Sequence, residues 1–299
     1  MLGKEDKMKK ILMLVVCASL LLTGCGSMGG TDMKKVTPSD FISVSMGESG
    51  GMERTSDLWF GVSKGSRGEA LFGFRLFVDD IEIEMANIEV DEGYVDEIVR
   101  IVNEYDMLKR GGKKLKIDAF AVDAAIPSFS LSIEGVETIS LDDGYKKSEG
   151  FAAGRCEIYS LLSDLAKQFT TQYYRGFFEN CTGTWTAPNE GMGEYIAFCY
   201  DNGTAACRIG EHGEQWARPA GSIDSFVYDA SEGVYTLGVY FPSEEADDMG
   251  HSWDGFYAKY KIMPGNGGEE LTVVSGEKPS ETVYYYDADR QLTFAEGQV

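Results

Sequence analysis

Basic residues and histidines are scarce in this chain. It contains 27 lysines and arginines against 49 aspartates and glutamates, two histidines, and a net charge of −22 at pH 7. A chain this acidic repels the phosphates of nucleic acids, which excludes DNA and RNA as partners. The same charge argues against electrostatic docking on anionic lipid and favours a soluble body. With 43% hydrophobic and 12% aromatic residues, that body is expected to be a packed globule and not a disordered chain.

The sequence also lacks an apolar run long enough to cross a membrane as a helix. The most prominent run, Ile11–Leu22, has 12 residues, whereas a spanning helix needs about 20. Three lysines between positions 7 and 10 precede this run, and the small residues Thr23 and Gly24 follow it. A basic segment, a short apolar segment and a small-residue cleavage site are typical of a secretory signal peptide. Residues 1–24 are therefore predicted to be a signal that is removed on export.

The four residues Leu22-Thr23-Gly24-Cys25 resemble the lipobox of bacterial prolipoproteins. In that family the cysteine thiol receives a diacylglyceryl group, and the signal is cut away in front of the cysteine. The resemblance implies that Cys25 carries the lipid and holds the protein on the extracytoplasmic face of the cell membrane. Acyl chains contribute about 0.8 kcal/mol per buried methylene, and more than one chain makes the anchor stable. An ordinary signal peptide remains the alternative, and translation starts at Met1 or at Met8.

Between residues 40 and 176 the hydrophobic pattern alternates between the two regular periods. Apolar and acidic residues alternate over 81–85, which is typical of a strand with one wet face. Apolar residues recur every three or four positions from Tyr94 to Leu108, which predicts an amphipathic helix, and a second helix is predicted over 152–171. We therefore expect an α+β domain over residues 40–176, an antiparallel sheet with two helices covering one face. Residues 25–39 are expected to be the lipidated tether.

Helical periodicity is absent from Cys181 onward, where short strand-like runs are separated by turn signals such as Asp201-Asn202-Gly203. This spacing predicts an all-β barrel or sandwich over residues 181–299. The segment opens with Gly183-Thr184-Trp185, which resembles the Gly-x-Trp start of lipocalin-like barrels. That resemblance implies a tryptophan at the closed end of the barrel, stacked on a basic side chain for which Arg290 is placed. Any small antiparallel barrel with a tryptophan in its first strand is the alternative.

Four cysteines remain for the folded body once the signal is removed and Cys25 is lipidated. An even number outside the cytoplasm permits two disulfides. Cys199 and Cys207 flank the turn at 201–203, and with these three residues as the loop both thiols would lie on one face of a hairpin. This pair is the predicted disulfide, and Cys156 with Cys181 follows by exclusion. The alternative is four reduced thiols that pack as small hydrophobic groups.

Serine catalysis is not expected from this sequence. Two segments, around Ser49 and Ser63, fit the pattern Gly-x-Ser-x-Gly. A nucleophilic serine needs a base in contact, and in hydrolases of this motif it also needs a strand-turn-helix setting. Neither segment precedes a predicted helix. A trypsin-like order would place the histidine upstream of the serine, but His212 and His251 both lie downstream.

Residue types that bind metals are present without the spacings that metal sites use. The histidines and cysteines form no Cys-x-x-Cys, His-x-His or His-Glu-x-x-His pattern, so no zinc site is expected. The acidic loop from Glu244 to Asp254 lacks the Asp-x-Asp-x-Asp-Gly pattern of calcium loops, and a solvated loop is expected instead. We expect no metal and no cofactor.

The aromatic residues after position 216 could line a sugar- or lipid-binding cavity, but most alternate along strands and are expected in the core. Trp216 and Trp253 lie in polar loops beside the two histidines and are the best candidates for ligand contacts. The predicted function is a non-enzymatic lipoprotein that binds an unidentified protein or small molecule. The alternative is a lipid-anchored hydrolase acting on cell-wall or glycan material. A cleft with converging carboxylates, or with a Ser/His pair, would favour the hydrolase.

Overall fold

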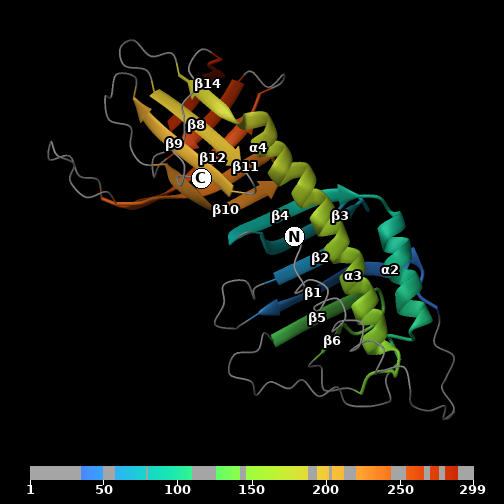
Figure 1. Cartoon of the computed structure of the whole chain (residues 1–299). Coiled ribbons are helices and arrows are strands. Elements are labelled where there is room, and N and C mark those ends of the chain that lie inside the picture. The colour runs from blue at the N-terminus through green and yellow to red at the C-terminus, as the bar shows by residue number, and fades with distance from the viewer. Residues whose placement is uncertain are drawn as a thin grey trace.

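The computed structural model describes residues 35–49, 58–78, 80–109, 126–141, 146–187, 194–201, 204–211, 220–243, 254–265, 270–275 and 280–288. Within these ranges the chain forms two regions that lie end to end, a sheet backed by helices and a barrel (Figure 1). The predicted signal peptide and Cys25 lie outside the described residues. Both therefore stay predictions.

The second region is a closed antiparallel barrel. Among the described residues it has eight strands, each paired with the next along the chain, and the last strand pairs with the first. The strands are β7 (Gly183–Thr186), β8 (Glu194–Asp201), β9 (Thr204–Glu211), β10 (Gly221–Asp229), β11 (Val234–Phe241), β12 (Phe256–Pro264), β13 (Glu270–Ser275) and β14 (Ser280–Tyr286). Side chains that point inward, such as Ile196, Leu237 and Ile262, are fully buried. The all-β prediction is confirmed, and the structure is a barrel and not a sandwich.

The first region is a twisted antiparallel sheet. Its strands are β1 (Phe41–Ser49), β2 (Leu58–Lys64), β3 (Ala70–Val78), β4 (Ile81–Val90), β5 (Ile126–Ile133) and β6 (Ile139–Ser140), and the 3₁₀-helix η1 (Pro38–Asp40) leads into β1. Their order in the sheet is β6-β5-β1-β2-β3-β4. The alternation predicted over 81–85 is present in β4, where Ile81, Ile83 and Met85 are buried.

Strand β10 belongs to both regions. Gly221 and Ser222 pair with β9 of the barrel, whereas Ser225–Asp229 pair in parallel with β4 of the sheet. A register shift between Ile223 and Ser225 accompanies the change of partner. The described strands therefore form one continuous 14-stranded sheet that closes into a barrel at one end. The α+β prediction for the first region is confirmed in outline, but nothing in the sequence pattern indicated this parallel junction.

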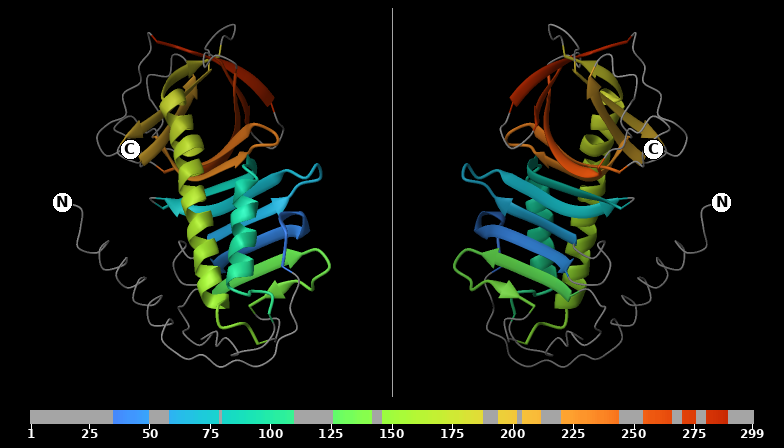
Figure 2. Two further views of the ribbon diagram at one scale, coloured as in Figure 1. Left: turned by 90° about the vertical axis from the view of Figure 1, so that its right-hand side faces the viewer. Right: turned by 90° about the vertical axis from the view of Figure 1, so that its left-hand side faces the viewer.

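Helices cover one face of the first sheet, and no helix of the described residues lies on the other, which we call the open face (Figure 2). The covering helices are α2 (Gly93–Glu104) and α3 (Phe151–Phe169). Edge-to-face ring contacts join α3 to the sheet, between Phe151 and Phe129 at 5.4 Å and between Tyr159 and Phe60 at 5.5 Å. Burying one apolar stripe of each helix against the sheet is what stabilises these helices in water.

The second predicted helix is longer than the sequence indicated. After α3 the chain continues through the π-helix η3 (Thr170–Arg175) into α4 (Gly176–Cys181). The hydroxyl of Thr170 donates to the carbonyl of Ala166 at 2.8 Å, a side-chain bond that perturbs helical geometry at this point. Phe177 and Phe178 then pack against Phe198 of the barrel, at 5.9 and 6.4 Å between ring centroids. Burial against the barrel rings therefore holds the extra turns in place.

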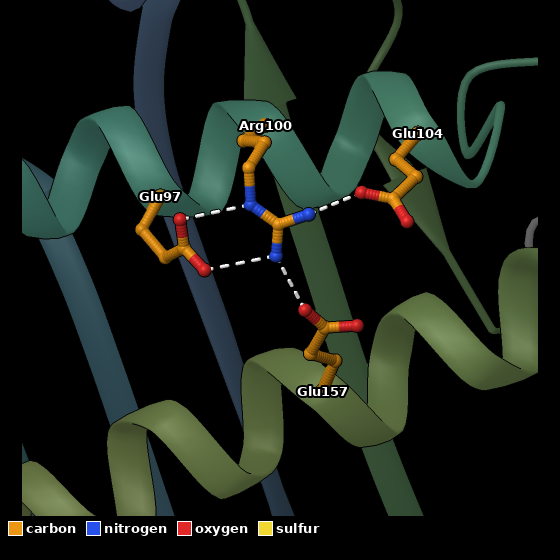
Figure 3. Close-up of polar contacts among 4 residues, drawn as sticks. All are labelled: Glu97, Arg100, Glu104 and Glu157. Atoms are coloured by element: carbon orange, nitrogen blue, oxygen red, sulfur yellow. Dashed lines mark hydrogen bonds and ion pairs between the residues drawn. The ribbon is translucent and has the colours of Figure 1, made fainter.

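One arginine ties the two covering helices together (Figure 3). Arg100 of α2 donates to both oxygens of Glu97 at 2.8 and 2.9 Å, and also to Glu104 and to Glu157 of α3. The Arg100 hydrogen bond lowers the pKa of Glu97, and the same contacts raise the pKa of Arg100. Because these side chains lie at the surface, packing and not this ion network carries most of the stability of the helix pair.

Neither candidate disulfide is present, and all four cysteines are thiols, which is the other arrangement that the sequence left open. In the β8–β9 hairpin Cys199 pairs with Ala206 and Cys207 pairs with Phe198, so the two sulfur atoms lie on opposite faces. The predicted pairing assumed a three-residue loop at 201–203, but Asp201 itself pairs with Thr204. A shift of one residue reverses the face on which a side chain lies.

The second predicted disulfide fails because of distance. Cys156 and Cys181 are joined by almost continuous helix, which separates them by roughly 35 Å, whereas disulfides need Cα atoms within about 7 Å. Burial raises the pKa of Cys181 to about 12 and also raises the pKa of Cys207. These two thiols pack in the core as small hydrophobic groups, whereas Cys156 is exposed.

Candidate binding face

The open face of the first sheet, opposite α2 and α3, carries small polar residues on β1 and β5 and charged residues on β3 and β4, namely Arg75, Glu82 and Glu84. In β1 and β5 serine occupies every second position, so the intervening Val44, Met46, Phe129 and Leu131 point toward the helices and are buried. The serines of neighbouring strands pair across this face. They are Ser43 and Ser45 in β1, Ser63 in β2, and Ser128, Ser130 and Ser132 in β5. The result is a surface of hydroxyl groups on three adjacent strands.

One large aromatic side chain, Trp59 of β2, lies on this open face. Its exposed fraction is 43%. A Cβ atom added to Gly61 would lie 2.8 Å from the ring atom Cζ2, and one added to Gly73 would lie 3.1 Å from Cζ3. Gly61 follows Trp59 by two residues on the same face, and it pairs with Gly73 of β3. The indole therefore lies along the sheet over the glycine pair, because a ring standing upright would not reach these positions.

A bulge in β4 deepens the surface beside the ring. Phe72 pairs with Ile88 and Phe74 pairs with Met85, so two residues of β4 oppose Gly73 alone. The second of these residues, Asn87, has a φ of 57°, in the left-handed region that asparagine tolerates better than most residues. The bulge thus turns the β4 backbone beside the Trp59 ring.

A carboxylate of the neighbouring strand holds Asn87 in this conformation. The side-chain amide of Asn87 donates to the two oxygens of Asp229 at 3.1 and 3.2 Å. The hydroxyl of Ser231 also donates to Asp229, at 2.6 Å, and is the main cause that lowers the pKa of this carboxyl group; the Asn87 amide adds to the effect. Asp229 therefore stays ionised at neutral pH and fixes one end of the bulge.

These elements enclose a shallow groove of about 240 Å³, which we call the Trp59 groove. The Trp59 ring, which lies over the Gly61–Gly73 pair, forms its base. Around the ring lie Leu71, Asn87 and the serines Ser43, Ser45 and Ser63. The lining therefore combines one aromatic surface with hydroxyl and amide groups, which bind ligands by stacking and hydrogen bonding. The volume is below the ~300–1,000 Å³ of pockets for drug-sized ligands, so the groove fits a single ring.

Few of the residues singled out in the sequence lie near this groove. Ser63 lines it, and Ser49 ends the same strand that carries Ser43. His212, His251, Trp216, Trp253 and Arg290 lie outside the described residues, so the proposed Ser/His and aromatic contacts stay untested. Asp254, the one described member of the acidic loop, is exposed. In the described ranges no group of three or more His, Cys, Asp or Glu residues is arranged to hold a metal ion.

Trp185, the tryptophan of the first barrel strand, is buried, in contrast to Trp59. Its indole N–H donates to the carbonyl of Cys181 at 2.8 Å, and its ring meets the Tyr286 ring edge-on at 5.2 Å. Trp185 is thus a core residue where α4 enters the first barrel strand. Of the barrel aromatics expected in the core, Phe241, Tyr260 and Tyr284 are buried. Four others are exposed, namely Tyr240, Tyr257, Tyr285 and Tyr286.

Sequence reasoning missed Trp59 and the serines around it. The available signal was serine at every second position in 43–45 and 128–132, which indicates a strand with one hydroxyl face. The pattern Trp59-x-Gly61 was a further sign, because glycine in the middle of a strand often marks close approach by another group.

Comparison with known proteins returns no match: no protein-family model fits the chain, and no curated sequence and no solved structure is significantly similar to it. None of the helices in the described ranges is both long enough and apolar enough to span a membrane. The function must therefore be argued from the residues themselves.

Proposed function

We propose that this protein is a membrane-anchored extracytoplasmic lipoprotein that binds a ligand, without catalysing a reaction, on the open face of its sheet. The observation that carries the binding role is the placement of Trp59. Its ring lies partly exposed along the sheet over two glycines, beside a bulge whose asparagine has positive φ. A ligand that stacks on this ring would complete the burial of its outer surface.

The groove departs from local structural preferences at three neighbouring positions. Glycine inside a strand weakens the strand, and both Gly61 and Gly73 are in strand interiors. Asn87 adopts a backbone conformation that few residues with side chains adopt. Departures of this kind concentrate at functional sites, because the rest of a natural sequence agrees with its fold. Three departures around one exposed tryptophan support a binding role for this face.

The membrane location rests on the lipobox resemblance at Leu22–Cys25. The lipid on Cys25 would hold the protein at the membrane, and residues 25–39 would link it to the folded body. The acidic chain would stay away from anionic headgroups, which leaves the open face accessible to material outside the cell.

The lipid anchor is tested by replacing Cys25 with serine and labelling cells with a palmitate analogue. Wild-type protein should take up the label and sediment with membranes, and Cys25→Ser should do neither. Cys17→Ser is the matched control, because Cys17 lies within the predicted signal and its replacement should leave labelling intact. Continued labelling of Cys25→Ser would contradict the anchor.

The binding role is tested with the whole protein in detergent and cell envelopes from the organism that makes it. Trp59→Ala should bind about tenfold more weakly than wild type, the loss typical of an aromatic anchor. Tyr285→Ala is the matched control, because Tyr285 is also 43% exposed but lies on the barrel strand β14, and its binding should not change. Equal binding by Trp59→Ala would contradict the role of the open face. Protein-dependent release of soluble envelope fragments would contradict the non-enzymatic role.

A further inference from the structure

We propose that the ligand of the Trp59 groove is a neutral saccharide, one sugar unit of which stacks on the Trp59 ring. This inference rests on the binding role proposed above and names the chemical class of the ligand. It is argued from the shape of the groove, the chemistry of its walls, the charges around it and the composition of the surrounding face.

The shape of the groove suits one ring of a flexible polymer. At about 240 Å³ it is open and shallow, and the Trp59 ring lies at its base over the glycine pair. A sugar ring has one face of C–H groups, which the electron-rich face of an indole attracts, and an edge of hydroxyl groups. The Trp59 ring lies beside the hydroxyls of Ser43, Ser45 and Ser63. A ring stacked on Trp59 would therefore present its hydroxyl edge to serine hydroxyls, which both donate and accept hydrogen bonds.

The open face continues beyond the groove in the direction that an oligosaccharide would take. Ser45 pairs with Ser130, and Ser43 pairs with Ser132, so hydroxyl groups extend from β2 across β1 to β5. Two strand spacings cover about 10 Å. This surface offers further hydrogen bonds to the units on one side of the stacked ring.

The charges around the groove disfavour an anionic ligand. The nearest cation on this face, Arg75, pairs with Trp59 across the strands, but its guanidinium is bound to Glu84 at 2.7 Å and to Glu82 at 3.1 Å. Asp229, which binds Asn87 of the groove, is ionised. The chain as a whole carries −22. Among the described residues of this face, a phosphate, a nucleotide or an acidic sugar would meet carboxylates and an arginine that two of them already bind, so we take the saccharide to be neutral.

A protein partner fits the open face less well. The cores of protein interfaces are enriched in aromatic residues, methionine and arginine and are depleted in serine. Here Trp59 is surrounded by serines of β1, β2 and β5, and Arg75 of β3 is engaged by two glutamates. The serine hydroxyls would lose little free energy when a hydroxyl-rich ligand displaces water, because each hydrogen bond to water is replaced by one to the ligand.

The test measures binding of the whole protein, in a detergent without sugar groups, to envelopes treated in two ways. Metaperiodate oxidises sugar units that carry a vicinal diol, whereas protease removes surface proteins. We expect periodate to abolish binding and protease to leave it intact. In competition, the neutral fraction of glycans released from the envelopes and passed over an anion exchanger should displace the protein, and the acidic fraction should not.

Three variants connect the result to the groove. Trp59→Ala should lose about tenfold in affinity, and Trp59→Phe should lose less because it keeps an aromatic ring. Gly61→Ala should also weaken binding, since its Cβ would push the indole off the sheet. Tyr285→Ala should bind like wild type.

The outcomes separate the two proposals. Binding that depends on Trp59 but survives periodate and is lost after protease would overturn the saccharide and keep the binding role. Competition by the acidic fraction alone would overturn the neutral ligand. Binding that Trp59→Ala does not weaken would overturn both proposals.

Discussion

The two faces of the first sheet come from the same strands and differ in almost every physical respect. On the helix-covered face, Phe60, Phe72 and Phe129 are at most 3% exposed and pack against rings of α3. On the open face, the alternate positions of β1, β2 and β5 carry mostly serine and glycine around the exposed Trp59, and those of β3 and β4 include Arg75, Glu82 and Glu84. Because side chains alternate strictly along a strand, each face can be built without changing the other. The covered face serves stability, and we assign binding to the open face.

The largest effect in this comparison is expected when one aromatic ring on each face is replaced by alanine. Phe72→Ala should lower the free energy of unfolding by about 3–5 kcal/mol, because Phe72 is fully buried against Phe74 and Phe169. Trp59→Ala should lower it by about 1–2 kcal/mol, since much of its ring already meets water. Urea denaturation followed by circular dichroism measures both. A loss for Trp59→Ala as large as that for Phe72→Ala would make Trp59 a core residue.

A second test asks whether glycine is needed at position 61 so that the Trp59 ring can lie against the sheet. Gly61→Ala should cost about 1 kcal/mol in the wild-type chain, because its Cβ would meet Cζ2 of Trp59 at 2.8 Å. In the Trp59→Ala background the same change should be neutral or stabilising, since alanine restricts the unfolded chain more than glycine does. The double-mutant cycle isolates the contact. If Gly61→Ala changes the stability equally in the two backgrounds, contact with the indole does not explain why glycine occupies position 61.

A smaller effect is expected at the bulge beside the groove. Asp229→Asn should reduce stability at pH 7 by under about 1 kcal/mol, because the carboxylate accepts bonds from Asn87 and Ser231 at an exposed site. The folded state lowers the pKa of Asp229 below 3.8, so its contribution is present above that pH. It is lost as the pH falls through the folded-state pKa. Urea midpoints of the two proteins should therefore converge as the pH falls below 3.8, the ordinary value for this carboxyl group, and a constant difference at all pH values would contradict this.

The smallest effect is expected at the exposed ion network of the covering helices. Arg100→Gln should lower the urea midpoint slightly at low salt, because it leaves Glu97, Glu104 and Glu157 without their shared cation. The difference should shrink at high salt, since ions screen surface charges. Lys167→Gln, which removes a separate exposed pair with Asp164, is the control and should change the midpoint less. A loss that salt does not reduce would mean that Arg100 acts through packing.

The sequence was most informative where structure depends on local periodicity. The period-two runs after Cys181 and the 3.6-residue stripe beginning at Tyr94 predicted the barrel and α2. The end of the second helix was missed, because the interactions that extend it are made with the barrel. Phe177 and Phe178 contact each other, and Phe178 contacts Tyr174, but their burial depends on barrel residues distant in the sequence, such as Phe198.

Pairing between distant strands could not be predicted in the same way. β10 reads as one more barrel strand, and no local pattern shows that Ser225–Asp229 will pair with β4. The disulfide prediction failed on a related point, because one residue of turn length decided which face Cys199 occupies. Register and partner depend on the whole fold, whereas alternation depends only on neighbouring residues.

The candidate site was missed because exposure is a property of the assembled sheet. Leu58-Trp59-Phe60 reads as a buried strand, and only the pairing of Trp59 with Gly47 and Arg75 shows which face the indole occupies. The aromatic residues selected from the sequence, Trp216 and Trp253, lie outside the described residues and remain candidates. The lipidation of Cys25 likewise remains a prediction from its motif.

The most direct measurement of the binding claim is fluorine NMR of the whole protein labelled with 5-fluorotryptophan. The chain has four tryptophans, and single Trp→Phe variants assign their four resonances. On addition of the neutral envelope glycan fraction, the Trp59 resonance should shift with saturation, and the resonance of the buried Trp185 should not. Saturable shifts at Trp216 or Trp253, with Trp59 unchanged, would contradict the assignment of binding to the open face.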